Sequence, residues 1–213
     1  SSFVNGGKLV EPIIIDRIQD SEGNTIYNND KRVCDDCSKI SYLTSDYPKI
    51  KNTYKQIFSP ETAFQMTSIL EGVVQRGTAK KLKDLKLNIA GKTGTTNNNT
   101  DTWFIGYTSD LLIGVYVGTD DPKPLGKYET GAKTALPIFK SFVVSVIKKS
   151  DARPFKAAKG TIMMVVDPNT GQKAKFTSKN TIIEVFKKKN VEEGKIPNLN
   201  SDRFNTNNIL KFY

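Results

Sequence analysis

The chain has 213 residues, the length of one ordinary domain or of one domain with a small appendage. Hydrophobic residues make up 37% and charged residues 25%, and no apolar run approaches the roughly 18 residues of a membrane span. The length excludes a miniprotein, and the composition is typical of a globular domain. The 32 basic and 22 acidic side chains give a formal charge of +10, which raises nucleic acid or an anionic surface as a partner.

Histidine is absent from the sequence, which excludes several common kinds of chemistry. The usual general base, the usual zinc ligand and every serine–histidine or cysteine–histidine pair are missing. Acid–base chemistry would therefore use lysine, tyrosine or carboxylates. The sequence opens with Ser1 and Ser2 and shows no charged and apolar leader, so we expect no signal peptide or anchor within it and expect a piece of a longer protein.

The two cysteines, Cys34 and Cys37, have the spacing of a redox pair, of half a zinc site or of a local disulfide. Zinc would need two further ligands, which here could only be carboxylates, so we expect no metal site. Asp35 and Asp36 lie between the thiols and disfavour a thiolate, which argues against a redox role. We therefore expect a loop with two thiols or one optional disulfide.

The first third of the chain is predicted to contain strands and a long loop. Two apolar runs, residues 9–18 and 25–27, flank turn-forming residues at 20–24 and predict a β-hairpin. Residues 28–55 are polar and irregular, and such a stretch is typical of a long surface loop.

A helix is expected to begin after Ser59, which can cap it. Pro60 suits the first helical position, and Glu61 complements the helix dipole. Apolar residues at helical spacing follow, and Gly72 and Gly77 are expected to weaken and end the helix.

Three extended runs come next, at residues 88–95, 101–107 and 111–118, and their short polar connectors predict an antiparallel meander. Residues 131–149 then carry a broad apolar stripe at helical spacing, so this helix can cover one face of the sheet. The expected fold class is therefore α+β, with an antiparallel sheet around residues 88–118 covered by a C-terminal helix.

The end of the chain is expected to form a second small unit. Apolar runs at residues 161–166 and 181–186 flank the turn at 167–171 and predict a two-stranded appendage. From Lys187 on, asparagine, lysine and glutamate dominate, so we expect a weakly ordered tail unless something holds it. The predicted division is residues 1–150 and residues 151–213.

The sharpest chemical signal is Lys-Thr-Gly-Thr at residues 92–95, on the first strand of the predicted meander. A random Lys-Thr-Gly-(Ser/Thr) is expected only about 0.03 times in a chain of this composition. Strand alternation places the hydroxyls of Thr93 and Thr95 on one side, and Gly94 leaves room for a backbone to approach. The plainer interpretation is a strand that runs into a turn with solvated threonines. Trp103 nearby is more simply explained as a packed aromatic residue than as a ligand platform.

With this motif the sequence resembles the transpeptidase domain of class A penicillin-binding proteins, whose motifs are Ser-x-x-Lys, Ser-x-Asn and Lys-Thr-Gly. The resemblance also covers, in the order of that family, residues 3–7, 59–63, 91–96, 101–107 and 114–121. It covers residues 1–150 closely, and residues 160–186 are similar to the family's C-terminal extension. It implies an incomplete fold of the penicillin-binding protein and serine β-lactamase type.

The resemblance also implies an activity: a serine acyl-enzyme cross-links peptidoglycan stem peptides and is the target of β-lactams. It implies that Lys92 supplies positive charge and helps a serine hydroxyl relay protons, and that the backbone N–H of Thr95 is an oxyanion-hole donor. The substrate-binding residues by the same resemblance are Thr93, Gly94, Thr95 and Thr96. No cofactor is implied. The implied location is the cell envelope, on the periplasmic side of the inner membrane, through an anchor outside this sequence.

The nucleophile of that family is not found, because residues 1–91 contain neither Ser-x-x-Lys nor Ser-x-Asn. Ser145 and Ser178 begin such patterns further on, but about 1.8 and 1.1 matches are expected by chance, and their order in the chain is wrong. We therefore expect the C-terminal half of a transpeptidase domain, which alone should not react with penicillin. Its uncovered sheet face should associate with the missing half or with another copy.

Four other functions remain as alternatives, one of them a non-catalytic scaffold for this fragment as it stands. A D,D-carboxypeptidase or a serine β-lactamase shares the chemistry, and only the flanking match to class A sequences favours a transpeptidase. A basic nucleic-acid-binding module is more distant, since only 5 of the 32 basic residues are arginine and no recognition module is present. We therefore expect no nucleic-acid partner.

Overall fold

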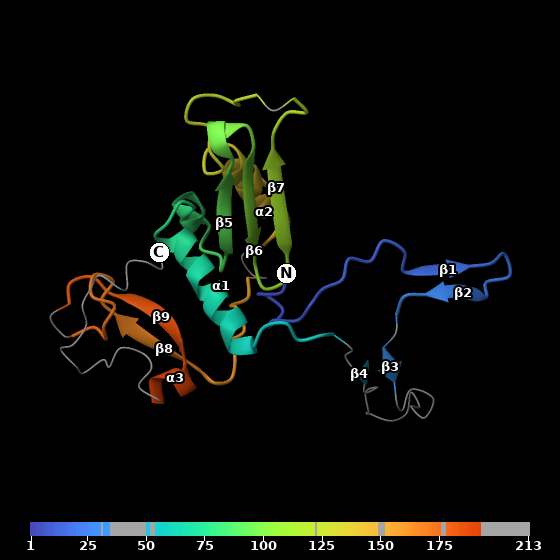
Figure 1. The fold of residues 1–213 in the computed structure, drawn as a ribbon, viewed down its shortest axis with the longest axis horizontal. Coiled ribbons are helices and arrows are strands. Elements are labelled where there is room, and N and C mark those ends of the chain that lie inside the picture. Colours follow the sequence, from blue (N-terminus) through green and yellow to red (C-terminus); the bar gives the residue numbers. More distant parts are fainter. Residues whose placement is uncertain are drawn as a thin grey trace.

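The computed structural model describes residues 1–30, 32–34, 50–51, 54–121, 123–148, 152–175 and 178–192. Within these ranges, helices flank a three-stranded antiparallel sheet, and the other strands form two-stranded pairs (Figure 1). The α+β class predicted from the sequence is confirmed. No helix in the described ranges has the length and apolar character of a membrane span.

The sheet contains β5 (Ala90–Thr95), β6 (Thr102–Tyr107) and β7 (Leu112–Val117) in that order, which confirms the predicted meander. A short 3-10 helix, η3 (Asn97–Asn99), connects β5 to β6. The register pairs Lys92 with Ile105 and Thr93 with Phe104. Paired residues share a face, so the sheet has a covered face, which carries Phe104, and an open face, which carries Ile105.

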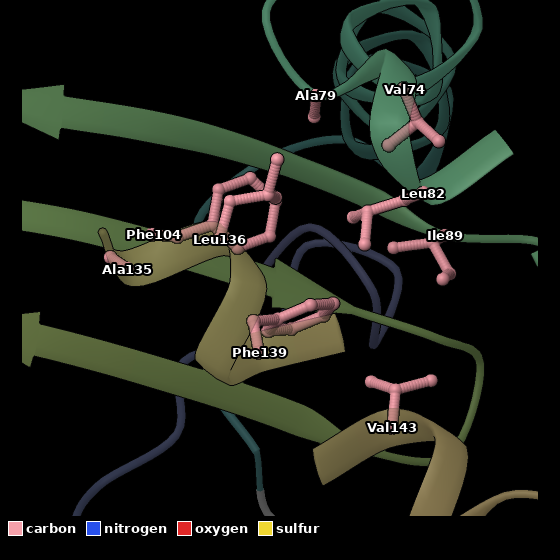
Figure 2. Packing of buried hydrophobic residues seen from close by; sticks show 9 residues of the cluster. All are labelled: Val74, Ala79, Leu82, Ile89, Phe104, Ala135, Leu136, Phe139 and Val143. Atoms are coloured by element: carbon pink, nitrogen blue, oxygen red, sulfur yellow. The ribbon is translucent and has the colours of Figure 1, made fainter. Parts of the chain in front are cut away.

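The covered face lies against α2 (Ala135–Val146), as the sequence predicts. Phe139 of α2 is fully buried, and its ring centroid lies 4.7 Å from that of Phe104 (Figure 2). The buried cluster around them comprises Val74, Ala79, Leu82, Ile89, Phe104, Ala135, Leu136, Phe139 and Val143. The helix begins at Ala135 rather than at residue 131. Pro137 stands in its first turn, where it lacks an N–H and would clash with an earlier helical turn.

Helix α1 (Pro60–Gln75) begins as predicted. The Oγ of Ser59 accepts the N–H of Thr62 at 3.2 Å, which satisfies one of the unpaired donors at the helix start. Gly72 lies inside the helix, which ends before Gly77. The 3-10 helix η2 (Lys80–Leu85) follows and buries Leu82 in the core. Helix α1 lies beside β5 (Figure 1).

The predicted hairpin is present as β1 (Arg17–Gln19) and β2 (Thr25–Asn28), and it projects away from the sheet with every strand residue exposed (Figure 1). In the stretch expected to be a loop, β3 (Val33–Cys34) pairs with β4 (Ile50–Lys51). Cys34 is disulfide-bonded, while Cys37 lies outside the described residues.

At the other end, β8 (Thr161–Val166) and β9 (Ile182–Lys187) form the predicted antiparallel pair. The first residues of the tail that was expected to be weakly ordered form a short helix, α3 (Lys188–Glu192), and the rest of that tail, residues 193–213, lies outside the described residues. The N–H of Lys188 donates to the carbonyl of Gly160 at 2.8 Å, a contact from a distant part of the chain. The predicted domain boundary falls at residues 149–151, outside the described ranges, and stays a prediction.

Candidate active site

All the site residues expected from the sequence lie on or directly after β5, an outer strand of the sheet. Lys92, Thr95 and Thr96 are exposed, and Thr93 and Gly94 are half-buried. In the described part of the chain no strand pairs with the outer edge of β5. The motif therefore presents an unpaired strand edge.

The direction of the backbone donors follows from one hydrogen bond at the end of β5. The N–H of Thr96 donates to the carbonyl of Asp101 at 3.0 Å, on the β6 side. Successive peptide groups of a strand point to opposite sides, so the N–H of Thr95 points to the outer edge. By the same alternation the N–H and carbonyl of Thr93 also point outward. A ligand at this edge meets backbone donors that β6 does not use.

Lys92 and two threonine hydroxyls meet at the same edge. The ammonium of Lys92 donates to the carbonyl of Thr93 at 3.0 Å and lies 3.4 Å from the Thr93 Oγ1. The Thr93 Oγ1 lies 3.0 Å from the Oγ1 of Thr78, which follows α1. Among the described carboxylates none forms an ion pair with Lys92. A positive charge beside hydroxyl donors suits an anionic ligand such as a carboxylate.

A glycine backbone holds the Thr95 side chain from the covered face. The N–H of Gly131 donates to the Thr95 Oγ1 at 3.1 Å. A Cβ at Gly131 would lie 2.4 Å from the carbonyl oxygen of Trp103 and 2.7 Å from that of Gly94, so only glycine fits. The register confirms that Thr93 and Thr95 share one face, although their hydroxyls have different partners.

The turn after the motif is braced by Asp101. Its N–H donates to the Oγ1 of Thr96 at 2.8 Å, and the Tyr116 hydroxyl donates to its carboxylate at 2.7 Å. The bond from Tyr116, with a further one from Thr100, lowers the pKa of Asp101. Trp103 lies against Tyr116 with ring centroids 4.7 Å apart and remains 42% exposed on the open face. Trp103 is thus a packed aromatic residue with one side accessible.

The two downstream serines are held in local structure. The Oγ of Ser145 donates to the carbonyl of Phe142 within α2 at 2.7 Å. The Oγ of Ser178 accepts the N–H of Lys175 at 3.1 Å. Neither lies at the edge of β5, which agrees with their rejection as nucleophiles. No group of three or more histidine, cysteine, aspartate or glutamate residues in the described ranges could hold a metal.

Sequence reasoning missed Thr78 and Gly131. Both reach the motif only through the packing of α1 and α2 around β5, and neither stands in a pattern that marks it. A glycine just before an apolar helix and a threonine just after a helix are common features, so no local signal separates these two residues from others.

Comparison with known proteins agrees with this site. The sequence model of the penicillin binding protein transpeptidase domain matches residues 1–143, so the chain belongs to that family. It is 41% identical over 192 residues to penicillin-binding protein 1A of Rickettsia conorii, across 89% of this chain and 24% of that protein. It is 31% identical over 217 residues to penicillin-binding protein 1A of Pseudomonas aeruginosa, across 88% of this chain and 26% of that protein.

The fold has a counterpart among solved structures. The crystal structure of penicillin-binding protein 1A from Haemophilus influenzae matches with a TM-score of 0.67 and 28% sequence identity. The match covers 86% of this chain and 30% of that one. The resemblance seen in the sequence is thereby confirmed, and the chain spans about a quarter of the length of the curated relatives it matches.

Proposed function

We propose that this chain supplies the Lys-Thr-Gly-Thr strand of a serine D,D-transpeptidase that cross-links the stem peptides of peptidoglycan. The observation that carries the proposal is the meeting of the Lys92 ammonium, the Thr93 hydroxyl and the outward N–H of Thr95 at the outer edge of β5. Membership of the transpeptidase family supports it. The serine would come from residues outside this sequence, because no Ser-x-x-Lys pattern precedes the motif.

In the proposed reaction, the serine attacks the peptide bond between two D-alanines, and negative charge develops on the carbonyl oxygen. The N–H of Thr95 stabilises that charge, a contribution whose loss typically costs about 3 kcal/mol. Thr93, Gly94 and Thr96 line the place of the terminal carboxylate. Lys92 provides its counter-charge and helps a serine hydroxyl relay the proton to the leaving amine.

The acyl-enzyme is then resolved by an amine of a neighbouring stem peptide. A D,D-carboxypeptidase or a serine β-lactamase would use water at this step, and the edge of β5 suits all three reactions. The similarity to penicillin-binding protein 1A sequences favours transfer to an amine. Mass analysis of products from a donor stem peptide, with and without an acceptor amine, separates cross-linking from hydrolysis.

The proposed partners are peptidoglycan stem peptides and β-lactams, with no nucleic acid and no cofactor. The proposed location is the cell envelope, on the periplasmic side of the inner membrane, with the membrane anchor outside this sequence. The formal charge of +10 agrees with a position near anionic envelope polymers.

The test uses the whole natural polypeptide that carries this sequence and a fluorescent penicillin. We expect stoichiometric labelling, and we expect Lys92→Ala to slow acylation by about 100-fold, since it removes charge from the site. Ser145→Ala is the control and should leave the rate unchanged. Absence of label on the wild-type polypeptide would contradict the proposal.

A further inference from the structure

Helix α1 lies between the sheet and a C-terminal ribbon, the pair formed by β8 and β9 (Figure 1). It contacts β5 on one side and β9 on the other. The helix therefore links the ribbon to the strand that carries the Lys-Thr-Gly-Thr motif, although β5 and the ribbon are far apart along the chain.

The ribbon holds α1 near both of its ends. At the start of the helix, the Lys187 ammonium donates to the Oγ1 of Thr62 at 2.7 Å. One turn on, the Gln65 side chain donates to the carbonyl of Val185 at 3.0 Å. At the far end, the guanidinium of Arg76 forms an ion pair with Glu184, whose side chain is only 13% exposed. These contacts tie β9 to α1 along its length.

The Arg76 guanidinium packs against a glycine inside the helix. Arg76 directly follows α1, and its side chain folds back over the helix. A Cβ at Gly72 would lie 2.9 Å from the guanidinium carbon, so a larger residue would require the flexible Arg76 side chain to shift. Gly72 weakens the helix by roughly 1 kcal/mol relative to alanine, and here it makes room for the ion pair with Glu184.

A tight turn connects this anchored end to the motif. A Cβ at Gly77 would lie 2.8 Å from the Cα of Val73, so the backbone turns closely against the helix. The N–H of Ala79 then donates to the carbonyl of Val73 at 3.1 Å. Thr78 stands within this turn, and its hydroxyl lies 3.0 Å from that of Thr93. Only Gly77 separates the anchored Arg76 from Thr78.

We propose that Thr78, Arg76 and Glu184 are positioning residues, through which the C-terminal ribbon fixes the orientation of the Thr93 hydroxyl. A hydroxyl rotates freely and donates only one hydrogen bond. When Thr78 donates to Thr93, the Thr93 proton is free to donate to a ligand carboxylate beside Lys92. The role of this hydroxyl in ligand binding rests on the proposed function, whereas the coupling itself does not.

Threonine-selective NMR of the 213-residue chain tests the coupling. The variants are Glu184→Gln, Thr78→Val and the conservative Thr78→Ser. The matched control is Glu192→Gln, which removes the carboxylate 3.7 Å from the Lys188 ammonium within α3. We expect the methyl and amide signals of Thr93 to shift in Glu184→Gln and Thr78→Val, and to stay at wild-type positions in Thr78→Ser and in the control.

A second readout uses penicillin acylation of the whole polypeptide, separated into binding and chemical steps. Glu184→Gln and Thr78→Val should weaken initial binding about three- to tenfold, while the acylation rate constant stays within about twofold. Thr78→Ser should restore binding.

An unshifted Thr93 signal in either Glu184→Gln or Thr78→Val overturns the positioning role. Signal shifts confined to β8 and β9 in Glu184→Gln would also overturn the positioning role, because a change in the ribbon would then not affect Thr93. A polypeptide that takes no label would end the proposed function and leave the NMR result to decide the coupling, so the two failures are distinguishable.

Discussion

The two faces of the central sheet come from the same strands, yet their side chains differ in burial. On the covered face, Phe104 is fully buried against Phe139 of α2. On the open face, Ile105 and Tyr116 are each 48% exposed and Leu112 is 44% exposed. The alternation of a strand places neighbours on opposite faces, so one residue step separates a core position from an uncovered one.

The difference in burial between the two faces shows the surroundings of Lys92 in the Lys-Thr-Gly-Thr motif. Lys92 pairs with Ile105, so its side chain leaves β5 on the open face, beside apolar residues that are exposed in the described part of the chain. Exposed apolar residues beside a cationic strand edge are typical of a surface that meets another polypeptide or a ligand. The covered face supplies the core and carries the side chains of Thr93 and Thr95, whereas the open face carries Lys92, so the site forms along the outer edge of β5 between the two faces.

The largest effect is expected on the covered face. Phe139→Ala removes a fully buried ring from the core and should lower the free energy of unfolding by about 3–4 kcal/mol. Phe142→Ala, on the same helix but 47% exposed, is the matched control and should cost less than about 1 kcal/mol. Urea denaturation measures both. Equal losses would mean that α2 does not stabilise the sheet through this face.

Replacing a glycine by alanine adds one methyl group, and Gly106 on the covered face and Gly114 on the open face allow the two faces to be compared in this way. A Cβ at Gly106 would lie 2.7 Å from the Phe104 ring and 2.8 Å from the Phe139 ring, whereas a Cβ at Gly114 would meet nothing within 4 Å. Gly106→Ala should therefore destabilise the chain by about 2 kcal/mol through overpacking. Gly114→Ala should be neutral or slightly stabilising, because alanine restricts the unfolded chain. Similar midpoints in urea for the two variants would contradict this assignment of the faces.

The open face is expected to make the isolated chain self-associate. The combined variant Ile105→Lys and Leu112→Lys places charge on that face and should weaken association at least about tenfold, or about 1.4 kcal/mol. Sedimentation velocity across a concentration series measures this. A wild-type chain that stays monomeric throughout the series would contradict the expectation.

The smallest effect concerns Glu71, a partly buried residue of α1 beside β5. Burial raises the pKa of Glu71, so the folded chain holds this proton more tightly than the unfolded chain. The associated stability is present below the unfolded-state pKa and is lost as pH rises through the folded-state pKa. Glu71→Gln avoids this loss and should raise Tm by about 1–2 °C at pH 8, with no change at pH 4. A lower Tm for the variant at pH 8 would reveal a favourable partner for the carboxylate.

Local patterns predicted the elements whose signals lie within a few residues. Ser59 and Pro60 mark the start of α1, and alternation marks the three strands of the sheet. The predicted start of α2, residue 131, was too early. The apolar stripe alone carries no information about Pro137, which cannot stand inside a helix without losing a hydrogen bond and clashing with the preceding turn. Helix α3 was missed because the contact of Lys188 with Gly160 joins distant parts of the chain.

In the candidate site too, the residues of a local motif were predicted, whereas those that meet it through long-range packing were not. The motif from Lys92 to Thr95 was found from its residue types, and the structure places it on β5, an outer strand of the sheet in the described ranges. Thr78 and Gly131 were not found, because each meets the motif only after α1 and α2 pack around β5. Contacts between residues far apart in the sequence produce no periodic pattern of residue types, so only the folded structure shows them.

The most direct test of the central claim is the intact mass of the whole natural polypeptide after incubation with penicillin, beside that of this 213-residue chain. The account predicts one acyl adduct on the whole polypeptide, about 100-fold slower formation in Lys92→Ala, and no adduct on the chain alone. A stoichiometric adduct on the chain alone would contradict it, since the reacting serine would then lie within these residues.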